Sequence, residues 1–340
     1  MKKKALITGI NGQDGAYLSE LLLDKNYEVY GAIRRGASEK TDRLDTLGVT
    51  NKIRFVDSDL LEISNIYQII EDIAPTEIYN LAAQSFVPTS FSLPLLTSDI
   101  NAMGCLRMLD SIKRINREIR FYQASTSEMF GKVAEIPQTE NTKLHPRSPY
   151  GVSKVYSHYM TINYRETYDI FACSGILFNH ESPLRGKEFV TRKITSSLNK
   201  IKYGLLDCME IGNMDAERDW GFAGDYVRAM WLMLNADHAD DYVIASGEKH
   251  SIREFIKLSL HFLDIDAEWE GEGLDEKVIN KSNGNVIIKV NPKYFRPAEV
   301  NILIGSPEKA KKELSWEPEV KFEELVKMMV EYDTKLIKPN

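Results

Sequence analysis

The chain has 340 residues, of which 43% are hydrophobic and 27% charged, and its formal net charge at pH 7 is −7. This length suits one large domain with a smaller appended lobe, and the apolar fraction is enough for a substantial core. The negative net charge argues against a general nucleic-acid-binding protein, because proteins that bind the phosphate backbone normally have a basic domain. Any anionic ligand must therefore meet local positive charge.

The cysteines and the apolar runs exclude further classes. Cys105, Cys173 and Cys208 are few and widely spaced, so neither a disulfide framework nor a metal site is predicted. No apolar run approaches the roughly 18 residues that a membrane helix needs. The first strand is expected within a few residues of Met1, which leaves no room for a signal peptide. We therefore expect a cytoplasmic protein with no membrane partner.

The first half of the chain alternates between short apolar runs and segments of helical periodicity. A strand is predicted at 4–8, a glycine-rich turn at 9–15 and a helix at 16–25. Further strands are expected at 28–33, 53–56, 77–81, 121–124 and 171–177, and further helices at 64–74, 101–115 and 149–167. This order predicts an α/β fold, a Rossmann-type doubly wound parallel sheet with helices on both faces.

After residue 179 the alternation loosens. Helices are predicted near 191–203, 225–235, 252–262 and 322–332, and a turn-rich stretch is predicted at 271–284. These segments predict a smaller C-terminal α/β lobe. We therefore expect a first domain at 1–180, to which later segments return, and a second lobe made mainly of 181–340.

The turn after the first strand carries three glycines at regular spacing. Gly9, Gly12 and Gly15 permit a tight turn, and the following helix offers free amides and a positive dipole end to a pyrophosphate. A glycine triplet alone is weak evidence, but its place between a strand and a helix favours dinucleotide binding over a simple tight turn. The expected cofactor contacts in this turn are Gly9, Asn11, Gly12, Gln13, Asp14 and Gly15.

Two later strand ends complete the predicted adenosine site. The second strand ends at Arg34 and Arg35, where NAD-specific domains usually place an acid for the ribose 2′-hydroxyl. Two arginines suit a 2′-phosphate instead, so NADP is the predicted cofactor; the alternative is a solvated surface pair. Asp59 and Leu60, after the third strand, either contact the adenine or form a strand-end turn, and both interpretations stay open.

A tyrosine and a lysine mark the predicted reaction centre. Tyr150 and Lys154 are four residues apart at the start of a helix, which places them on one face. A nearby ammonium favours the phenolate, so Tyr150 is predicted to act as a base below the usual tyrosine pKa of about 10. Such a pair is common by chance. Its position after the fifth strand, whose carboxyl end carries Thr126 and Glu128, is where this fold places chemistry.

Motifs along the whole chain resemble those of the extended short-chain dehydrogenase/reductase family, and within it the nucleotide-sugar 4,6-dehydratases. The motifs that carry the resemblance are Thr8–Gly15, Leu81–Ser85, Phe121–Glu128, Arg147–Tyr150, Gly175–Pro183, Arg218–Trp220 and Tyr294–Val300. Each motif is moderately specific, and their ordered set is highly specific.

The resemblance implies a dehydration of a nucleotide sugar through internal redox chemistry. Tyr150 takes the proton of the sugar O4 while C4 gives a hydride to NADP, and Thr126 holds O4 by a hydrogen bond. Glu128 removes the C5 proton and assists loss of the C6 hydroxyl as water, after which the hydride returns to C6. A 4-epimerase or reductase does not need this carboxylate, so Glu128 favours a dehydratase; the alternative is a strand-end surface charge.

The resemblance also implies which residues contact the cofactor and which contact the substrate. Those to the cofactor are Leu81, Ala82, Ala83, Gln84 and Ser85 beside the nicotinamide ribose, Tyr150 and Lys154, His180 near the carboxamide and Arg185 toward a phosphate. Those to the substrate are Ser85, Thr126, Ser127 and Glu128 around the sugar, and Asn179, Val190, Lys193, Arg218 and Arg296 at the nucleotide diphosphate. His180 is equally open to a structural interpretation.

Rival functions remain within and outside the enzyme class. A reductase or epimerase of GDP-sugars has the same fold, and a non-enzymatic NADP sensor would have lost the tyrosine, lysine or acid, none of which is lost here. Family members acting on dTDP-hexoses usually carry Asp-Glu after the threonine, whereas this chain has Ser127 and Glu128. The sequence therefore favours a GDP-linked sugar and leaves open whether the sugar is mannose or a heptose.

Some positions depart from the family pattern, and assembly is implied only by the resemblance. Leu96 and Phe130 replace frequent tyrosines, and Phe222 replaces a frequent histidine. These changes put in doubt individual cofactor contacts rather than the reaction class. The resemblance implies a homodimer or homotetramer, with 35–43 as a candidate arm that reaches a neighbour's cofactor.

Overall fold

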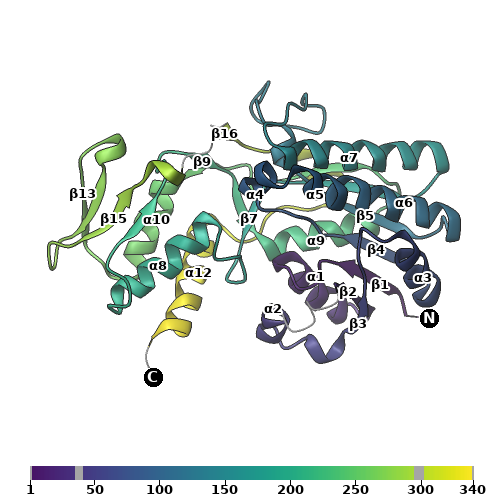
Figure 1. Ribbon diagram of the computed structural model, residues 1–340, viewed down its shortest axis with the longest axis horizontal. Helices are drawn as coiled ribbons and strands as arrows, with labels where there is room; N and C mark the ends of the chain where they lie inside the picture. Colours follow the sequence, from purple (N-terminus) through teal and green to yellow (C-terminus); the bar gives the residue numbers. More distant parts are fainter. Residues whose placement is uncertain (1, 35–40, 295–301, 339–340) are drawn as a thin grey trace.

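A seven-stranded parallel sheet forms the larger lobe of the computed structural model, which describes residues 2–34, 41–294 and 302–338 (Figure 1). Its strands, in order across the sheet, are β11 (Asp241–Ile244), β6 (Ala172–Leu177), β5 (Arg120–Thr126), β4 (Glu77–Asn80), β1 (Lys4–Thr8), β2 (Glu28–Ile33) and β3 (Arg54–Asp57). All neighbouring pairs are parallel. The predicted Rossmann-type sheet is confirmed, and its order reverses between β1 and β4, where such sheets open a crevice for ligands.

Helices cover both faces of this sheet, which explains why its central strands are buried throughout. On one face α1 (Gln13–Asp24), α9 (Ala223–Leu234) and α11 (Glu308–Leu314) share one apolar core, and on the other α3 (Ile63–Ile73), α6 (Gly104–Ile115) and α7 (Pro149–Tyr168) share a second. The second half of the chain therefore supplies the last strand, β11, and two covering helices. Among the described helices, none is both long and apolar enough to span a bilayer.

Short helical segments connect the strands of the larger lobe. They are α2 (Asp42–Thr46), η1 (Thr50–Lys52), α4 (Val87–Ser92), α5 (Pro94–Ser98), η2 (Asp99–Met103) and η3 (Ser127–Met129). The helix predicted at 101–115 starts as a π-helical turn, η2, before α6 begins. Asn101 in this turn donates hydrogen bonds to the Gln84 carbonyl oxygen and to Ser153 Oγ, both at 3.1 Å, and so joins the loop after β4 to α7.

The smaller lobe packs three helices against a four-stranded sheet. The helices are α8 (Val190–Lys202), α10 (Ile252–Phe262) and α12 (Phe322–Ile337). The strands, in order across the sheet, are β13 (Ala267–Glu270), β14 (Lys277–Asn280), β15 (Val286–Val290) and β8 (Met209–Ile211). The short helix η4 (Gly273–Asp275) connects β13 to β14. Strand β14 corrects the prediction of turns throughout 271–284. It was missed because the strand has only four residues, of which Val278 alone is fully buried, and lies between glycine- and asparagine-rich turns.

Three short ladders lie between the lobes (Figure 1). Strand β7 (Asn179–Glu181) pairs with β10 (Trp220–Phe222), and β9 (Glu217–Arg218) pairs with β12 (His250–Ser251) and β16 (Ile302–Leu303). The segment η5 (Pro292–Tyr294) follows β15. These ladders bring residues that are far apart in the sequence to the open end of the large sheet.

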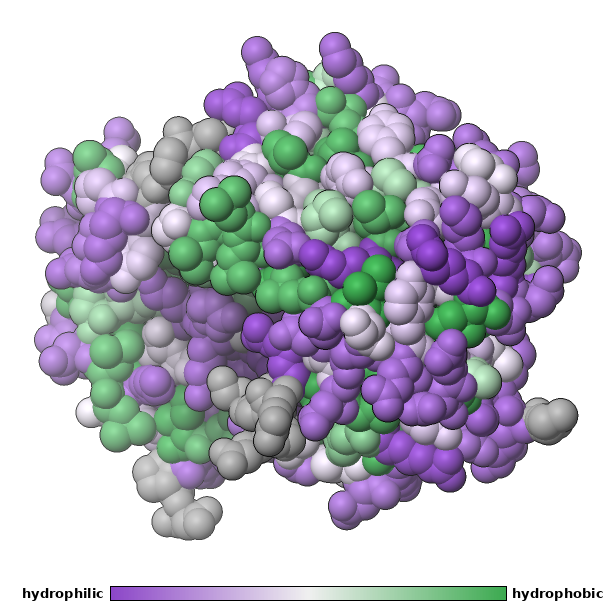
Figure 2. Space-filling view, turned by 45° about the vertical axis from the view of Figure 1, so that its right-hand side comes forward, coloured by the Kyte–Doolittle hydropathy of each residue, from purple (hydrophilic) through white to green (hydrophobic). Residues whose placement is uncertain are grey.

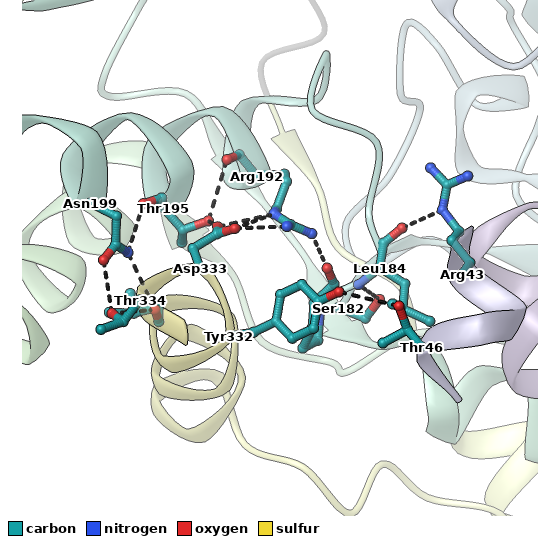
Figure 3. Close-up of polar contacts among 12 residues, drawn as sticks. Arg43, Thr46, Ser182, Leu184, Arg192, Thr195, Asn199, Tyr332, Asp333 and Thr334 are labelled. Atoms are coloured by element: carbon teal, nitrogen blue, oxygen red, sulfur yellow. Dashed lines mark hydrogen bonds and ion pairs between the residues drawn. The ribbon is translucent and has the colours of Figure 1, made fainter. Parts of the chain in front are cut away.

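A buried ion pair fastens α12 to the wall between the lobes (Figure 3). Arg192 on α8 places Nη2 2.7 Å from Asp333 Oδ1 on α12, and both side chains are almost fully buried. Thr195 also donates to the Asp333 carboxylate, and Arg192 Nη1 donates to the Pro183 carbonyl oxygen. Because removing one member of a buried pair leaves an uncompensated charge, this contact fixes α8 and the loop after β7 relative to α12.

Candidate active site

A cavity of about 620 Å³ opens where the carboxyl ends of β1, β4, β5 and β6 face the smaller lobe. Figure 2 shows the molecule hollowed between the two lobes. The sequence-predicted residues that line this cavity are Gly9, Gly12, Gln13, Asp14, Gly15, Leu81, Ala83, Ser85, Thr126, Glu128, Tyr150, Lys154, Asn179, His180, Arg185, Val190, Lys193 and Arg218. The structure therefore brings most of the predicted cofactor, reactive and substrate positions into one space.

The other predicted positions lie outside the cavity lining or outside the described residues. Asn11, Ala82, Gln84 and Ser127 stand beside lining residues without lining the cavity, and Arg34, Asp59 and Leu60 lie away from the lining. Arg34 is exposed. Asp59 Oδ1 accepts a hydrogen bond from the Leu61 amide at 3.0 Å, as the strand-end-turn interpretation expects. Arg35 and Arg296 lie outside the described residues.

The glycine turn has the shape that a dinucleotide requires. Gly9 has a φ of +70°, and a Cβ there would lie 2.8 Å from the Ala82 amide nitrogen. A Cβ on Gly15 would lie 2.5 Å from the Gly9 carbonyl oxygen. No side chain caps the start of α1, so its first amides remain available to an anion. The turn thus fits a pyrophosphate group.

Tyr150 and Lys154 are aimed at the end of β5 by the start of α7. Ser148 caps this helix by accepting a hydrogen bond from the Gly151 amide at 3.0 Å, and Pro149 occupies the first turn. Lys154 Nζ then donates to the Ala124 carbonyl oxygen at 2.8 Å. The predicted pair therefore meets the strand end that carries Thr126.

Thr126 and Glu128 share a single helical turn at that strand end. Thr126 caps η3, accepting a hydrogen bond from the Glu128 amide at 3.3 Å, and its side chain also hydrogen-bonds with Tyr150. Glu128 is half-buried and lines the cavity. A hydroxyl, a phenol and a carboxylate thus converge on one space, which is the set needed to move protons at neighbouring carbon and oxygen atoms.

Burial controls the ionisation of the tyrosine and lysine. It raises the pKa of Tyr150, with the Thr126 hydrogen bond acting in the opposite direction. It lowers the pKa of Lys154 to about 8. The sequence-based expectation of a lowered tyrosine pKa is therefore wrong. The ammonium of Lys154 is directed to Ala124 and lies 5.9 Å from the tyrosine ring centroid, so desolvation outweighs its attraction.

A buried histidine–aspartate pair lies beneath the start of α1. His180 Nε2 lies 2.9 Å from Asp14 Oδ2, and Nδ1 lies 2.8 Å from the Phe178 carbonyl oxygen. Burial lowers the pKa of His180, but Asp14 more than offsets this, so the pKa is raised; burial likewise raises the pKa of Asp14, and His180 brings it below its usual value. Both ring nitrogens are thus engaged by the protein, and His180 ties β7 to the glycine turn.

The smaller lobe contributes a cationic and aromatic wall. Lys193 Nζ lies 3.6 Å from the centroid of the Tyr294 ring, a cation–π geometry. Arg218 is buried, and Nη1 donates to the Glu217 carbonyl oxygen at 2.7 Å. Arg185 Nε lies 3.1 Å from Glu181 Oε2. These side chains supply the local positive charge that the net charge of −7 made necessary for any anionic ligand.

Sequence reasoning missed several lining residues, among them Phe86, Phe189 and Tyr294, and it expected Arg43, which also lines the cavity, in an arm at 35–43 that reaches a neighbour's cofactor. Tyr294 is the first residue of the family motif Tyr294–Val300, but no sequence pattern predicted that it contacts a ligand. The three departures from the family pattern lie outside the lining. Phe130 packs on Phe178 in the core, Phe222 packs on Tyr17, and Leu96 is partly exposed.

A family model described as GDP-mannose 4,6 dehydratase matches residues 6–329. This chain belongs to the GDP-mannose 4,6-dehydratase family. It is 50% identical over 348 residues to the GDP-mannose 4,6 dehydratase of Drosophila melanogaster, covering 99% of this chain and 88% of the relative. The Homo sapiens protein of the same name is 49% identical over 344 residues, with 99% and 92% covered.

Solved structures share the fold of this GDP-mannose 4,6-dehydratase family member. A UDP-glucose 4-epimerase from Thermotoga maritima with UDP-glucose superposes with a TM-score of 0.83 at 22% identity, covering 98% of this chain and 100% of that one. A dTDP-glucose 4,6-dehydratase from Bacillus anthracis in complex with NAD has a TM-score of 0.80 at 20% identity, covering 98% and 97%. At these identities the likeness supports the fold alone.

Proposed function

We propose that this chain converts GDP-mannose into GDP-4-keto-6-deoxymannose and water, as a hydro-lyase that uses NADP without consuming it. Family membership supports the dehydration and the substrate. The single observation that carries the assignment is the convergence of Thr126, Glu128 and Tyr150 on one cavity beside the glycine turn. Glu128 is the group that an epimerase or reductase of this fold does not need.

Each reactive side chain has a distinct task in this proposal. Thr126 donates a hydrogen bond to the sugar O4, and Tyr150 takes the O4 proton. When bound, the nicotinamide supplies a reversible two-electron oxidation of the sugar. A ketone at C4 acidifies the C5 hydrogen, which Glu128 removes as a proton and passes to the C6 hydroxyl, so that this group leaves as water. C6 then regains the hydride taken from C4, and Tyr150 returns the O4 proton to C5. Lys154 holds positive charge on the face of α7 that carries Tyr150.

The remaining predicted residues are proposed as binding groups. The cofactor lies along the glycine turn and the loop Leu81–Ser85, with His180 and Arg185 at its far side. The nucleotide diphosphate meets Asn179, Val190, Lys193, Arg218 and Arg296. The chain divides accordingly into a cofactor domain at 1–180, to which later segments return, and a mainly substrate-binding lobe at 181–340.

We propose NADP rather than NAD because Arg34 and Arg35 follow the last residue of β2 in the sequence, at positions where NAD-specific domains carry an acid. A solved neighbour, RMD from Pseudomonas aeruginosa complexed with NADPH, shares the fold with a TM-score of 0.78 at 23% identity over 99% of this chain and 100% of that one. Titration calorimetry with both dinucleotides decides between them.

The proposal includes a homodimer or homotetramer in the cytoplasm. Helices α5 and α7 pack together and expose apolar side chains: Leu95 is 85% exposed and Val152 57%. An apolar face of this kind is typical of an interface between copies of a chain. Light scattering distinguishes one, two and four copies. Cys105, Cys173 and Cys208 are free thiols, in keeping with a reducing compartment.

The test follows a label through the reaction. The purified protein is incubated with GDP-mannose deuterated at C4, without added reductant. We expect the product to carry deuterium at C6, and product without the label at C6 would overturn the mechanism. Parallel incubations with dTDP-glucose and a GDP-heptose test the substrate, and faster turnover of either would contradict the assignment to GDP-mannose.

A variant separates oxidation from elimination. Glu128→Gln is expected to accumulate reduced cofactor, seen by its absorbance, while forming no dehydrated product. Exposed Glu118, at the opposite end of β5, supplies the matched control Glu118→Gln, which should turn over normally. Full turnover in Glu128→Gln would contradict the role given to this carboxylate.

A further inference from the structure

Arg43 spans two walls of the cavity that the sequence separates widely. It lies on α2, lines the cavity, and donates from Nε to the Leu184 carbonyl oxygen at 2.6 Å (Figure 3). Its Nη1 donates to the Asn11 carbonyl oxygen at 3.1 Å. Leu184 belongs to the loop after β7, and Asn11 belongs to the glycine turn. One guanidinium therefore ties the start of α1 to the opposite side of the cavity.

Arg43 forms no ion pair within the described part of the chain, although the carboxylates of Glu188 and Asp42 lie near enough to favour its charge. Its neighbours Arg185 and Arg192 have ion-pair partners, Glu181 at 3.1 Å and Asp333 at 2.7 Å, whereas the described ion pairs include none with Arg43. Burial lowers the pKa of Arg43; Glu188 faces it and opposes this, while Arg192 and Arg185 repel it. A half-buried guanidinium without an ion pair, close to two further arginines, is a favourable place for a ligand's negative charge.

One terminal nitrogen of this guanidinium, Nη2, is left for a ligand, because Nε and Nη1 already donate to Leu184 and Asn11. Figure 3 shows the two terminal nitrogens of Arg43 directed away from Leu184. Among the described residues Nη2 has no hydrogen-bond partner, and the planar fork of arginine matches the oxygens of a phosphate.

We propose that Arg43 binds a phosphate of the dinucleotide held on the glycine turn of its own chain and acts as a strap across the bound cofactor. The inference rests on the proposed function. Because the net reaction returns both electrons to the sugar, the cofactor has no need to leave between turnovers, and a strap that slows its release does not slow catalysis. This role differs from the expectation that 35–43 only reaches a neighbouring copy, since Arg43 lines the cavity of its own chain.

The test measures nucleotide binding directly, without reference to dehydration. Arg43→Gln, Arg43→Lys and wild type are freed of nucleotide and titrated with NADP⁺ and NAD⁺, and the release of NADP⁺ is timed by displacement. We expect Arg43→Gln to weaken NADP⁺ binding roughly 10- to 100-fold, mostly through faster release, and Arg43→Lys to lose less. Exposed Arg117 provides the control Arg117→Gln, which should bind as wild type does.

Smaller ligands identify which phosphate is held. If Arg43 contacts the pyrophosphate, Arg43→Gln loses affinity for NAD⁺, NADP⁺ and 5′-ADP alike. If it contacts the 2′-phosphate, only NADP⁺ and 2′,5′-ADP are affected. Unchanged affinities and release rates in a folded Arg43→Gln variant, judged by circular dichroism, would overturn the strap while leaving the deuterium test intact. Failure of wild type to bind either dinucleotide would overturn the proposed function itself.

Discussion

The two walls of the cavity are built in different ways. The wall of the larger lobe holds Thr126, Tyr150 and Lys154 through contacts with one strand end and the helix that follows it. The wall of the smaller lobe presents Lys193 and Arg218 from a helix and a two-residue strand, and depends on remote partners such as Asp333 for its position.

This difference separates chemistry from recognition. Groups that move protons must be held within a fraction of an ångström of the reacting atoms, which favours a wall made of adjacent, buried backbone elements. Groups that attract a diphosphate act through longer-range charge and tolerate a wall assembled from distant segments. We therefore expect substitutions in the larger lobe to change kcat, and substitutions in the smaller lobe to change KM.

The largest effect is expected at the wall of the larger lobe. Tyr150→Phe removes the group that takes the O4 proton and should lower kcat by roughly 10²- to 10⁴-fold with little change in KM. Steady-state kinetics with GDP-mannose measures both constants. The nearby exposed tyrosine provides the control Tyr159→Phe, which should match wild type. A rise in KM with kcat preserved would mean that Tyr150 serves recognition instead, and the comparison between the walls would fail.

An intermediate effect concerns the buried lysine and the pH. The pKa of Lys154 is about 8 in the folded chain against an ordinary value of 10.5, so below pH 8 the fold carries the full penalty of a buried ammonium. Between these values the unfolded chain holds a proton that the folded chain has released, and stability therefore rises with pH. Lys154→Met lacks this penalty. At pH 7 its free energy of unfolding should exceed that of wild type by about 3 kcal/mol, and the difference should shrink toward pH 10.

Chemical denaturation of the cofactor-free proteins at a series of pH values measures this difference. Exposed Lys335 offers the control Lys335→Met, whose stability should follow wild type at every pH. If the difference in free energy of unfolding between Lys154→Met and wild type stayed constant or widened with pH, the Lys154 ammonium would not be desolvated. The larger-lobe wall would then be more open to water than its contacts indicate.

The smallest effect is expected at the wall of the smaller lobe. Lys193→Gln removes one cation near the proposed diphosphate site and the cation–π contact with Tyr294. We expect KM for GDP-mannose to rise up to about tenfold while kcat stays within about twofold, because a single half-buried charge at the cavity wall contributes on the order of 1 kcal/mol. Exposed Lys338 supplies the control Lys338→Gln. A loss confined to kcat would place Lys193 among the reacting groups.

The same two walls explain what the sequence could and could not predict. The glycine turn and the pair Tyr150 and Lys154 are encoded within a few residues of a strand or a helix start, so periodicity and turn chemistry locate them. The place of Arg43 depends on a contact with Leu184 across 141 positions, which no local pattern reports. Strand β11 was missed for a related reason: its four residues form a strand only because β6 offers a parallel edge.

The pair of Arg192 and Asp333 sets an order of events during synthesis. A ribosome delivers the chain from its N-terminal end, so the glycine turn and strands β1 to β6 are synthesised before the smaller lobe is complete. Arg192, however, must wait for a partner 141 positions downstream. The larger lobe likewise waits for β11 and α11, so both walls of the cavity are completed only when nearly the whole chain has been made.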